Sequence, residues 1–263
     1  MRVLPLPLVL LVSLALLVLV RPQPSKDATF HEEDWLTVIG TDSFSPGLTD
    51  KEIALLASQG VSPADLALER RDESLSIKIK GFHIARREVS AEEYAEFLAS
   101  DAAREAGIPS PPGWKGKHPP AGTEKLPIRG ITLEEAQAYA AFRRARLPSE
   151  VEWEFAFRGA TQWFYPWGNA FDGHRAVTSV GQPRPVDAKP YEVHGVFHVS
   201  GNVAEWTTSR LAPYGETPRP DAPVVVRGGS FRDRASACRL TSRRGVSRDA
   251  RADDVGIRLV RDQ

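Results

Sequence analysis

The feature that most limits the fold is the uneven distribution of helix signals along the chain. SAEE at 90–93 and TLEE at 132–135 are capping boxes, in which a hydroxyl and a glutamate satisfy the first free N–H groups of a helix. Ser149 caps a third short helix, and two more helical patterns lie within 49–71. Helices are rare after Trp163, so the sequence predicts one α+β domain in which early helices are followed by a loop-rich β region.

Strand signals are short. Apolar and polar residues alternate over 75–84, which predicts one strand with a buried face, and the apolar runs at 224–226 and 255–260 predict two further strands. The segment 109–127 is rich in proline, glycine and lysine and is expected to form a long surface loop. The tryptophans are interpreted as core and loop anchors rather than as a stacking platform.

The N-terminus is apolar over residues 3–20, which as a helix would be roughly 27 Å long, enough to cross a membrane. Residues 1–21 are therefore a signal peptide or a membrane anchor, with contact to the membrane if the segment is not cleaved. Residues 22–34 are polar and contain prolines, which predicts a linker. Residues 35–263 are predicted to form the folded domain. Both alternatives place the domain outside the cytoplasm, in the periplasm, secreted or membrane-anchored.

The charge balance limits the choice of partner. The chain has 34 basic and 34 acidic residues, so no basic excess is present to neutralise phosphates, and we expect no nucleic-acid binding. Arginines and aspartates crowd the last third of the sequence. They predict a solvated surface with ion pairs or, alternatively, a groove for an anionic ligand. The arginines concerned are Arg232, Arg234, Arg239, Arg243, Arg244, Arg248 and Arg251.

LPSEVEWEFA, GNVAEW and RGGSF occur in order between residues 75 and 263. Together these motifs resemble the formylglycine-generating enzyme family, also called the sulfatase-modifying-factor family. The resemblance implies a C-type-lectin-like α+β fold with little regular secondary structure, often stabilised by calcium. It also implies relatedness to oxidases that convert a sulfatase cysteine to formylglycine with copper and oxygen, although other members of this family have other chemistry or none. The family therefore does not settle the function.

The resemblance places a pair of copper-binding cysteines just after the GGS motif. Cys238, the only cysteine, stands at the second position, but Asp233 stands at the first. Copper(I) prefers soft thiolates, so a thiolate with a hard carboxylate is a poor pair, and copper is not expected. Ser230 corresponds to the serine beside the substrate cysteine. Cys238, Ser230 and Asp233 are the candidate catalytic residues, but a lone thiol is more often a small buried hydrophobic group.

The resemblance also implies a calcium site at four positions, which in this sequence are His198, Gly201, Val203 and Glu205. A histidine nitrogen is a poor ligand for calcium, so the site is expected to be degenerate. Val177 and Glu192 are further departures from the pattern. Another metal at Glu192, His194, His198 and Glu205 is the alternative to ordinary turn histidines.

These observations leave three functions open. The leading hypothesis is a binding or accessory module without formylglycine-generating activity, which holds a protein or peptide in a groove formed near Ser230 by Asp233, Arg234 and Cys238. The alternative is an extracytoplasmic metal-dependent oxidoreductase that uses Cys238, His198 or Asp233. The third possibility is a structural partner of a sulfatase or an envelope complex.

Overall fold

A computed structural model describes residues 32–189 and 191–263. The helices are α1 (Asp50–Ser58), α2 (Pro63–Glu69), α3 (Ala91–Ala99), α4 (Asp101–Glu105), α5 (Leu133–Phe142) and α6 (Glu150–Phe157), with 3-10 turns η1 (Glu32–Asp34), η2 (Gly159–Thr161) and η3 (Ala235–Cys238). The strands are β1 (Trp35–Val38), β2 (Thr41–Phe44), β3 (Ile77–Ile79), β4 (Phe82–Ala85), β5 (Glu192–Val193), β6 (Val196–Phe197), β7 (Ala204–Arg210), β8 (Val224–Arg227), β9 (Arg244–Val246), β10 (Val255–Gly256) and β11 (Val260–Asp262). Many short elements and long irregular connections confirm the predicted α+β class.

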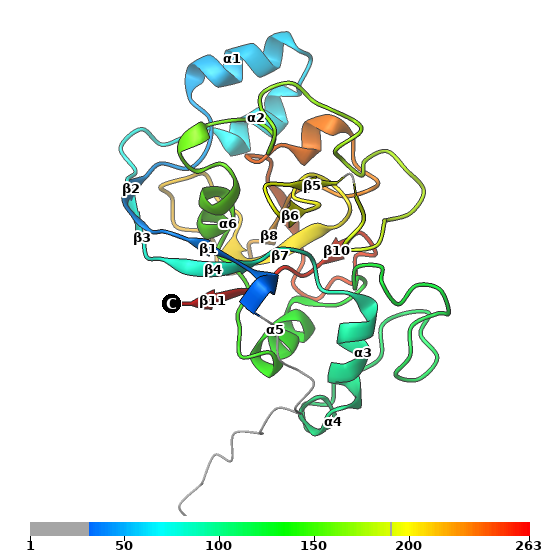
Figure 1. Cartoon of the computed structure of the whole chain (residues 1–263). Helices are drawn as coiled ribbons and strands as arrows, with labels where there is room; N and C mark the ends of the chain where they lie inside the picture. Colours follow the sequence, from blue (N-terminus) through cyan, green and yellow to red (C-terminus); the bar gives the residue numbers. More distant parts are fainter. Residues whose placement is uncertain (1–31, 190) are drawn as a thin grey trace, which may run out of the picture.

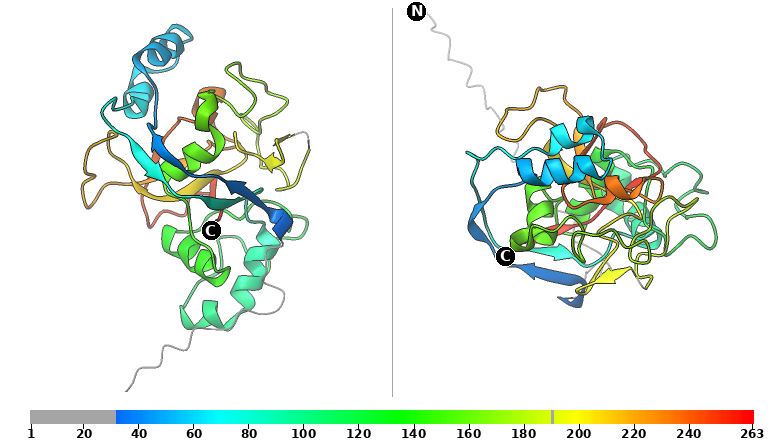
Figure 2. Two further views of the ribbon diagram at one scale, coloured as in Figure 1. Left: turned by 60° about the vertical axis from the view of Figure 1, so that its left-hand side comes forward. Right: turned by 90° about the horizontal axis from the view of Figure 1, so that it is seen from above.

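Two small sheets form the centre of the molecule. One has the order β10-β7-β8-β9, in which only the β10–β7 pair is parallel, and the other has the order β1-β4-β11. Helices α1 and α2 lie at one end of the molecule and α3 to α5 at the other, with the strands between them (Figures 1 and 2). The last strand thus pairs with one of the first, so both ends of the described chain meet in one sheet.

The largest apolar cluster joins α3 and α5 to β7, β8 and the residues after Val255. Trp206 and Tyr139 are fully buried in it, and Trp153 is fully buried in a neighbouring cluster beneath α6. Full burial of such large side chains contributes about 1.5–3 kcal/mol each or more. For these tryptophans the interpretation as core anchors is confirmed.

The helix starts follow from local sequence. Thr49, Ser90, Thr132 and Ser149 each accept the N–H of the residue three positions later, and that glutamate accepts the N–H of the cap residue in return. All four are complete capping boxes. The two predicted boxes and the predicted cap at Ser149 are therefore confirmed.

Two predicted strands are divided in the structure. The alternating segment 75–84 breaks at Lys80 and Gly81, so β3 pairs with β2 while β4 pairs with β1. The segment 255–260 is divided between the two sheets. Val255 in β10 pairs with β7, whereas Val260 in β11 pairs with β4. Residues 257–259 cross between the two sheets and are fully buried at Ile257 and Leu259. Apolar content alone does not distinguish such a crossing from a continuous strand.

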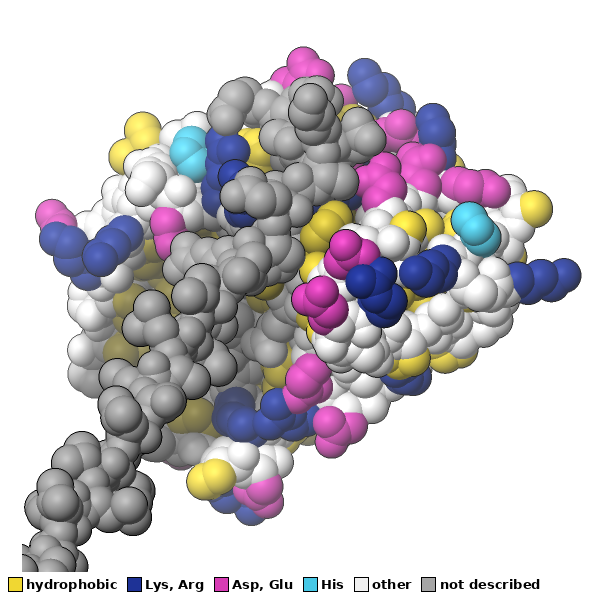
Figure 3. All heavy atoms as spheres, turned by 90° about the horizontal axis from the view of Figure 1, so that it is seen from below, with side chains coloured by type: hydrophobic (Ala, Val, Ile, Leu, Met, Phe, Trp, Pro, Cys, Tyr) yellow, Lys and Arg dark blue, Asp and Glu magenta, His cyan; other side chains and the backbone are white. Residues whose placement is uncertain are grey.

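The expectation that the late arginines form a solvated surface holds only for some of them. Arg239 and Arg243 are buried and pair with buried glutamates, Glu69 at the end of α2 and Glu150 at the start of α6. The two glutamates are far away in the sequence from the arginines that they neutralise. Arg239 and Arg243 therefore form neither a solvated surface nor an anion groove, and both predictions are wrong for these two residues. On the described part of the face shown in Figure 3, basic and acidic side chains are interspersed.

The last three residues of the predicted linker, Glu32–Asp34, form η1. The Asp34 carbonyl accepts the Arg86 N–H at 2.8 Å, which joins this turn to the residue after β4. The apolar run at 3–20 and the rest of the predicted linker lie outside the described residues. Within 32–189 and 191–263, none of the helices has both the length and the apolar character needed to span a membrane.

Candidate functional site at the GGSF turn

The GGSF motif forms a tight turn directly after β8. Gly228 and Gly229 have φ values of +87° and +69°, a region that favours glycine. A Cβ on Gly229 would lie 2.6 Å from the Sγ atom of Cys238 and 2.7 Å from the Ala237 carbonyl oxygen. The second glycine is therefore required by the close approach of η3, which carries Cys238 against the turn.

Asp233 stabilises this turn. Its Oδ2 atom accepts the Ser230 N–H at 2.9 Å and the Ser230 hydroxyl at 2.8 Å, and its backbone carbonyl accepts the Ser179 N–H at 2.9 Å. The Ser230 hydroxyl also lies 3.1 Å from Oδ2 of Asp254. The structure thus brings Ser230 and Asp233 together as predicted, but in contacts that close a turn.

Replacing Asp233 by alanine should lower the free energy of unfolding by about 1–2 kcal/mol, because the buried Ser230 N–H loses its acceptor and the Ser230 hydroxyl keeps only Asp254. Chemical denaturation of the wild type and the variant measures this difference. Asp249→Ala, at an exposed position, is the matched control and should change stability by less than about 0.5 kcal/mol. Equal effects of the two substitutions would contradict the structural role of Asp233.

Cys238 is fully buried. Burial raises the pKa of its thiol to about 12, and the nearby charge of Asp233 adds to this increase. The thiol therefore stays protonated at neutral pH, although thiolates are the form that attacks electrophiles and binds copper. The Asp233 carboxylate already accepts two hydrogen bonds from Ser230. Cys238 and Asp233 therefore do not fit a copper(I) centre.

The cavity beside the turn is small. It has a volume of about 30 Å³ and is lined by Gly229, Asp233, Ala237 and Arg244, among others. This is room for about one water molecule. The side chains of Ser230 and Cys238 have no exposed surface, so they do not line an open groove with Asp233, contrary to the predicted arrangement. A peptide reaching them would require the turn to open.

His198 lies in the loop before the GN motif and is 1% exposed. Its Nε2 atom lies 2.9 Å from the Pro185 carbonyl oxygen, while Nδ1 has no hydrogen-bond partner among the described residues. Burial lowers the pKa of His198 to about 4, so its ring is neutral at neutral pH. His194 instead lies at the turn between β5 and β6, with a positive φ of 54°.

Glu205 faces fixed donors. Its Oε2 atom accepts the Trp153 indole N–H at 2.5 Å, and Oε1 accepts Nε of the buried Arg258 at 2.9 Å. Arg258 also donates to the carbonyl oxygens of Ala85 and Phe197 at 3.0 and 2.8 Å. A guanidinium thus already supplies the positive charge beside Glu205.

The other two predicted calcium positions take part in backbone contacts. The Gly201 N–H donates to the Gly228 carbonyl at 2.9 Å, and the Val203 N–H donates to Oε1 of Glu88 at 3.3 Å. With a neutral histidine and the Arg258 charge in the same region, these residues do not fit a calcium ion. Among the described residues no group of three or more histidine, cysteine or acidic side chains is arranged to hold a metal.

Glu88 was missed by sequence reasoning. It is fully buried, accepts the Asn202 side-chain N–H at 2.8 Å, and burial raises the pKa of its carboxyl well above the ordinary value. It follows two arginines and precedes a helix cap, a pattern that is typical of surface glutamates. The sequence therefore carries no local signal that would reveal this residue.

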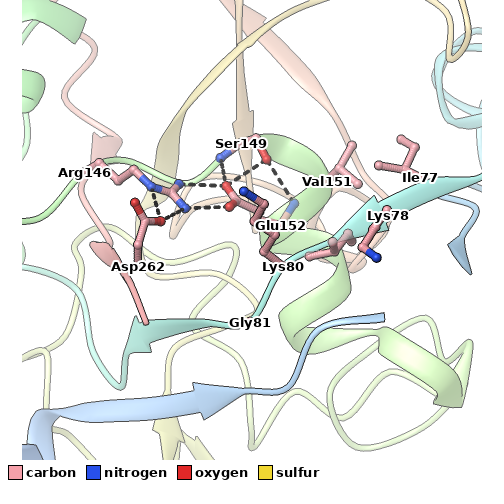
Figure 4. Close-up of a pocket in the computed structure, with 10 residues that line it drawn as sticks. Ile77, Lys78, Lys80, Gly81, Arg146, Ser149, Val151, Glu152 and Asp262 are labelled. Carbon is pink, nitrogen blue, oxygen red and sulfur yellow. Dashed lines mark hydrogen bonds and ion pairs between the residues drawn. The ribbon is translucent and has the colours of Figure 1, made fainter. Parts of the chain in front are cut away.

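A cavity of about 330 Å³ lies between β3, the start of α6 and Asp262. Arg146 points between two carboxylates there, with bonds of 2.7 Å from Nη2 to both Glu152 and Asp262 (Figure 4). Glu152 is also the acceptor of the α6 capping box. Arg146 is thus already paired with two carboxylates, and Glu152 also closes the helix cap, so both side chains have a structural role.

Comparisons with known proteins agree with these motifs. A profile of the sulfatase-modifying factor enzyme 1-like domain matches residues 50–263. The inactive C-alpha-formylglycine-generating enzyme 2 of Mus musculus is 36% identical over 156 residues, which cover 52% of this chain and 49% of that protein. The hercynine oxygenase of Mycolicibacterium thermoresistibile is 31% identical over 255 residues, covering 77% of this chain and 56% of that protein.

The chain spans about half the length of the curated relatives it matches. Among solved structures, PvdO from Pseudomonas aeruginosa superposes with a TM-score of 0.63 at 21% identity, covering 87% of this chain and 94% of that one. This likeness shows the fold, and the family match shows the descent. The chain belongs to the sulfatase-modifying factor enzyme 1-like family and has its C-type-lectin-like α+β fold.

Proposed function

We propose that this protein is an extracytoplasmic binding or accessory module that has no formylglycine-generating activity. The observation that carries the proposal is Asp233. It stands where the resemblance implies the first copper-binding cysteine, and its carboxylate closes the turn by accepting two hydrogen bonds from Ser230. A residue with this role leaves Cys238 without a partner thiolate, and the protonated, buried Cys238 is itself a poor ligand.

Two further observations support the proposal. The similarity to a relative named as an inactive formylglycine-generating enzyme shows that the family contains members described without that activity. The apolar segment at 3–20 supports a location outside the cytoplasm. The competing oxidoreductase hypothesis is supported by the similarity to hercynine oxygenase. It requires a different metal centre, for which His198 and Glu205 are candidates. Glu205 is already bonded to Trp153 and Arg258, and His198 to the Pro185 carbonyl.

The proposal predicts that a cysteine-containing sulfatase peptide remains unchanged when it is incubated with the purified protein, copper and oxygen. Mass spectrometry after aldehyde-specific labelling measures the product, and a catalytically active family member is the positive control. The formation of aldehyde above the level of copper alone would refute the proposed function. Stoichiometric iron, copper or zinc in the purified protein that is lost in His198→Ala would instead support the oxidoreductase.

The same site offers a gain-of-function variant. Asp233→Cys places a second thiol near Cys238 and is expected to raise copper(I) affinity by at least about 100-fold, because two thiolates suit this soft ion. Competition with a chromogenic copper(I) chelator measures the affinity. Ser236→Cys adds a thiol on η3 without restoring the pair and is the matched control. Equal affinities of the two variants would contradict the assignment of Asp233 as the position of the lost ligand.

A further inference from the structure

A further pocket lies beside Arg129, whose guanidinium contacts the Phe231 ring of the GGSF turn. It has a volume of about 290 Å³ and is formed where the long loop at 109–127 passes over residues 128–130 and 251–253. Pro112, Trp114 and Pro120 line it on the loop side, and Arg129 and Asp253 line the opposite side. This volume is close to the lower limit of typical ligand sites, which are lined mainly by apolar groups with a few polar ones.

The apolar wall is held in place by the core. The Trp114 ring packs edge-to-face on Tyr94, with centroids 6.2 Å apart, and Tyr94 is fully buried. Pro112 lies against Gly130, where a Cβ would meet its Cδ atom at 3.5 Å. The Trp114 indole N–H makes no hydrogen bond within the described residues, so it remains as a donor. The loop thus presents a fixed aromatic group with an available N–H.

The opposite wall carries one uncompensated positive charge. Arg251 pairs with Glu135, and Arg232 pairs with Asp253, so the charges of these four residues cancel. Arg129 donates to the backbone carbonyl of Asp253 at 3.0 Å but has no carboxylate partner among the described residues.

The guanidinium of Arg129 is also held in position. Its carbon lies 5.8 Å from the ring centroid of Phe231, the aromatic residue of the GGSF turn, and the Arg232 guanidinium lies 5.3 Å from the same ring. Phe231 is 1% exposed, so it gives Arg129 a rigid support. An arginine that is oriented in this way, and not neutralised, is suited to a carboxylate.

We propose that this pocket binds an extended peptide segment of a partner protein in which an acidic residue lies beside proline. The carboxylate pairs with Arg129, and the proline packs against Trp114 and its neighbouring prolines. The Trp114 N–H donates to a peptide carbonyl, as aromatic grooves do for proline-rich segments. The inference deepens the proposed function, on which it rests, because it gives the accessory module a binding site and a class of partner.

The test uses fluorescence anisotropy of full-length protein in detergent with two labelled peptides. One is fluorescein-Gly-Pro-Glu-Pro-Leu-amide, and the other has glutamine in place of glutamate. We expect saturable binding of the glutamate peptide, at least about fivefold weaker binding of the glutamine peptide, and weaker binding at higher ionic strength. Arg129→Gln should remove the preference for glutamate, and Trp114→Leu should weaken the binding of both peptides.

Arg210→Gln is the matched control, because Arg210 likewise donates to a backbone carbonyl, that of Ala222 at 3.1 Å, and the substitution removes the same charge elsewhere. It should leave both affinities unchanged, and thermal unfolding checks that all variants are folded. Equal binding of the two peptides, equal effects of the two arginine substitutions, or no binding up to millimolar concentration would each overturn the proposal. The aldehyde assay tests the proposed function separately, so either hypothesis can fail alone.

Discussion

Replacing Glu154 by glutamine should lower the free energy of unfolding by about 3–5 kcal/mol, because it leaves the buried Arg227 guanidinium without a compensating charge and leaves Arg158 with Glu52 as its remaining acid partner. Glu154 is fully buried and lies 2.7 Å from Arg227 and 3.3 Å from Arg158. It also accepts the Gly47 N–H at 2.8 Å and the Tyr214 hydroxyl at 3.0 Å. Denaturant unfolding followed by circular dichroism measures the loss.

Glu96→Gln is the control for this prediction. Glu96 pairs with Arg143 at 3.0 Å, but its side chain is 49% exposed, so the expected loss is below about 1 kcal/mol. If Glu154→Gln and Glu96→Gln lowered the free energy of unfolding by similar amounts, the prediction that the buried ion pair contributes more than the exposed one would be wrong.

The pH dependence gives a second test of the Glu154 carboxylate. Burial raises its pKa, but Arg227 and Arg158 outweigh this and hold the pKa below the ordinary value of 4.5. Its stabilisation is thus present above pH 4.5 and is lost as the pH falls through the folded-state pKa. The difference in stability between wild type and Glu154→Gln should shrink on acidification.

The second large effect is expected for Gly201→Ala, in the GN motif. Gly201 has a φ of +91°, and an added Cβ would lie 2.2 Å from the carbonyl oxygen of Val177. That carbonyl accepts the Asn202 N–H at 2.8 Å, so the backbone cannot move away without breaking this bond. We expect a loss of roughly 3 kcal/mol or more, measured by denaturant unfolding.

Gly60→Ala separates backbone strain from steric overlap. Gly60 has a similar φ of +86°, but nothing lies within 4 Å of an added Cβ. It should therefore cost only about 1 kcal/mol, the usual penalty for an alanine at positive φ. If Gly201→Ala were no more destabilising than Gly60→Ala, the close contact with Val177 would be contradicted.

Local signals predicted the helix starts well, because each capping box involves residues only three positions apart. The β segments were harder. The continuous pattern at 255–260 was predicted as one strand, yet Val255 and Val260 belong to different sheets. Which sheet a short apolar run joins depends on partners far away in the sequence, and neither periodicity nor composition contains that information.

The candidate site shows the same division. The motifs identified the family and the position of Asp233, because spacing relative to GGS is a local property. They did not show that Cys238 is buried against Gly229, that Arg258 bonds to Glu205, or that Arg129 has no acid partner within 32–189 and 191–263. Predictions that treated Ser230 and Cys238 as groove residues assumed exposure that only packing decides.

The sequence by itself determined the fold class and several helix starts, since these depend on residues close together along the chain, and it placed Asp233 where the resemblance implies a cysteine. The tertiary structure decided which charges are buried and neutralised, such as those of Glu69 and Arg239. That outcome depends on distance and desolvation, and residues from opposite ends of the chain, such as Glu69 and Arg239, acquire both only when the chain folds.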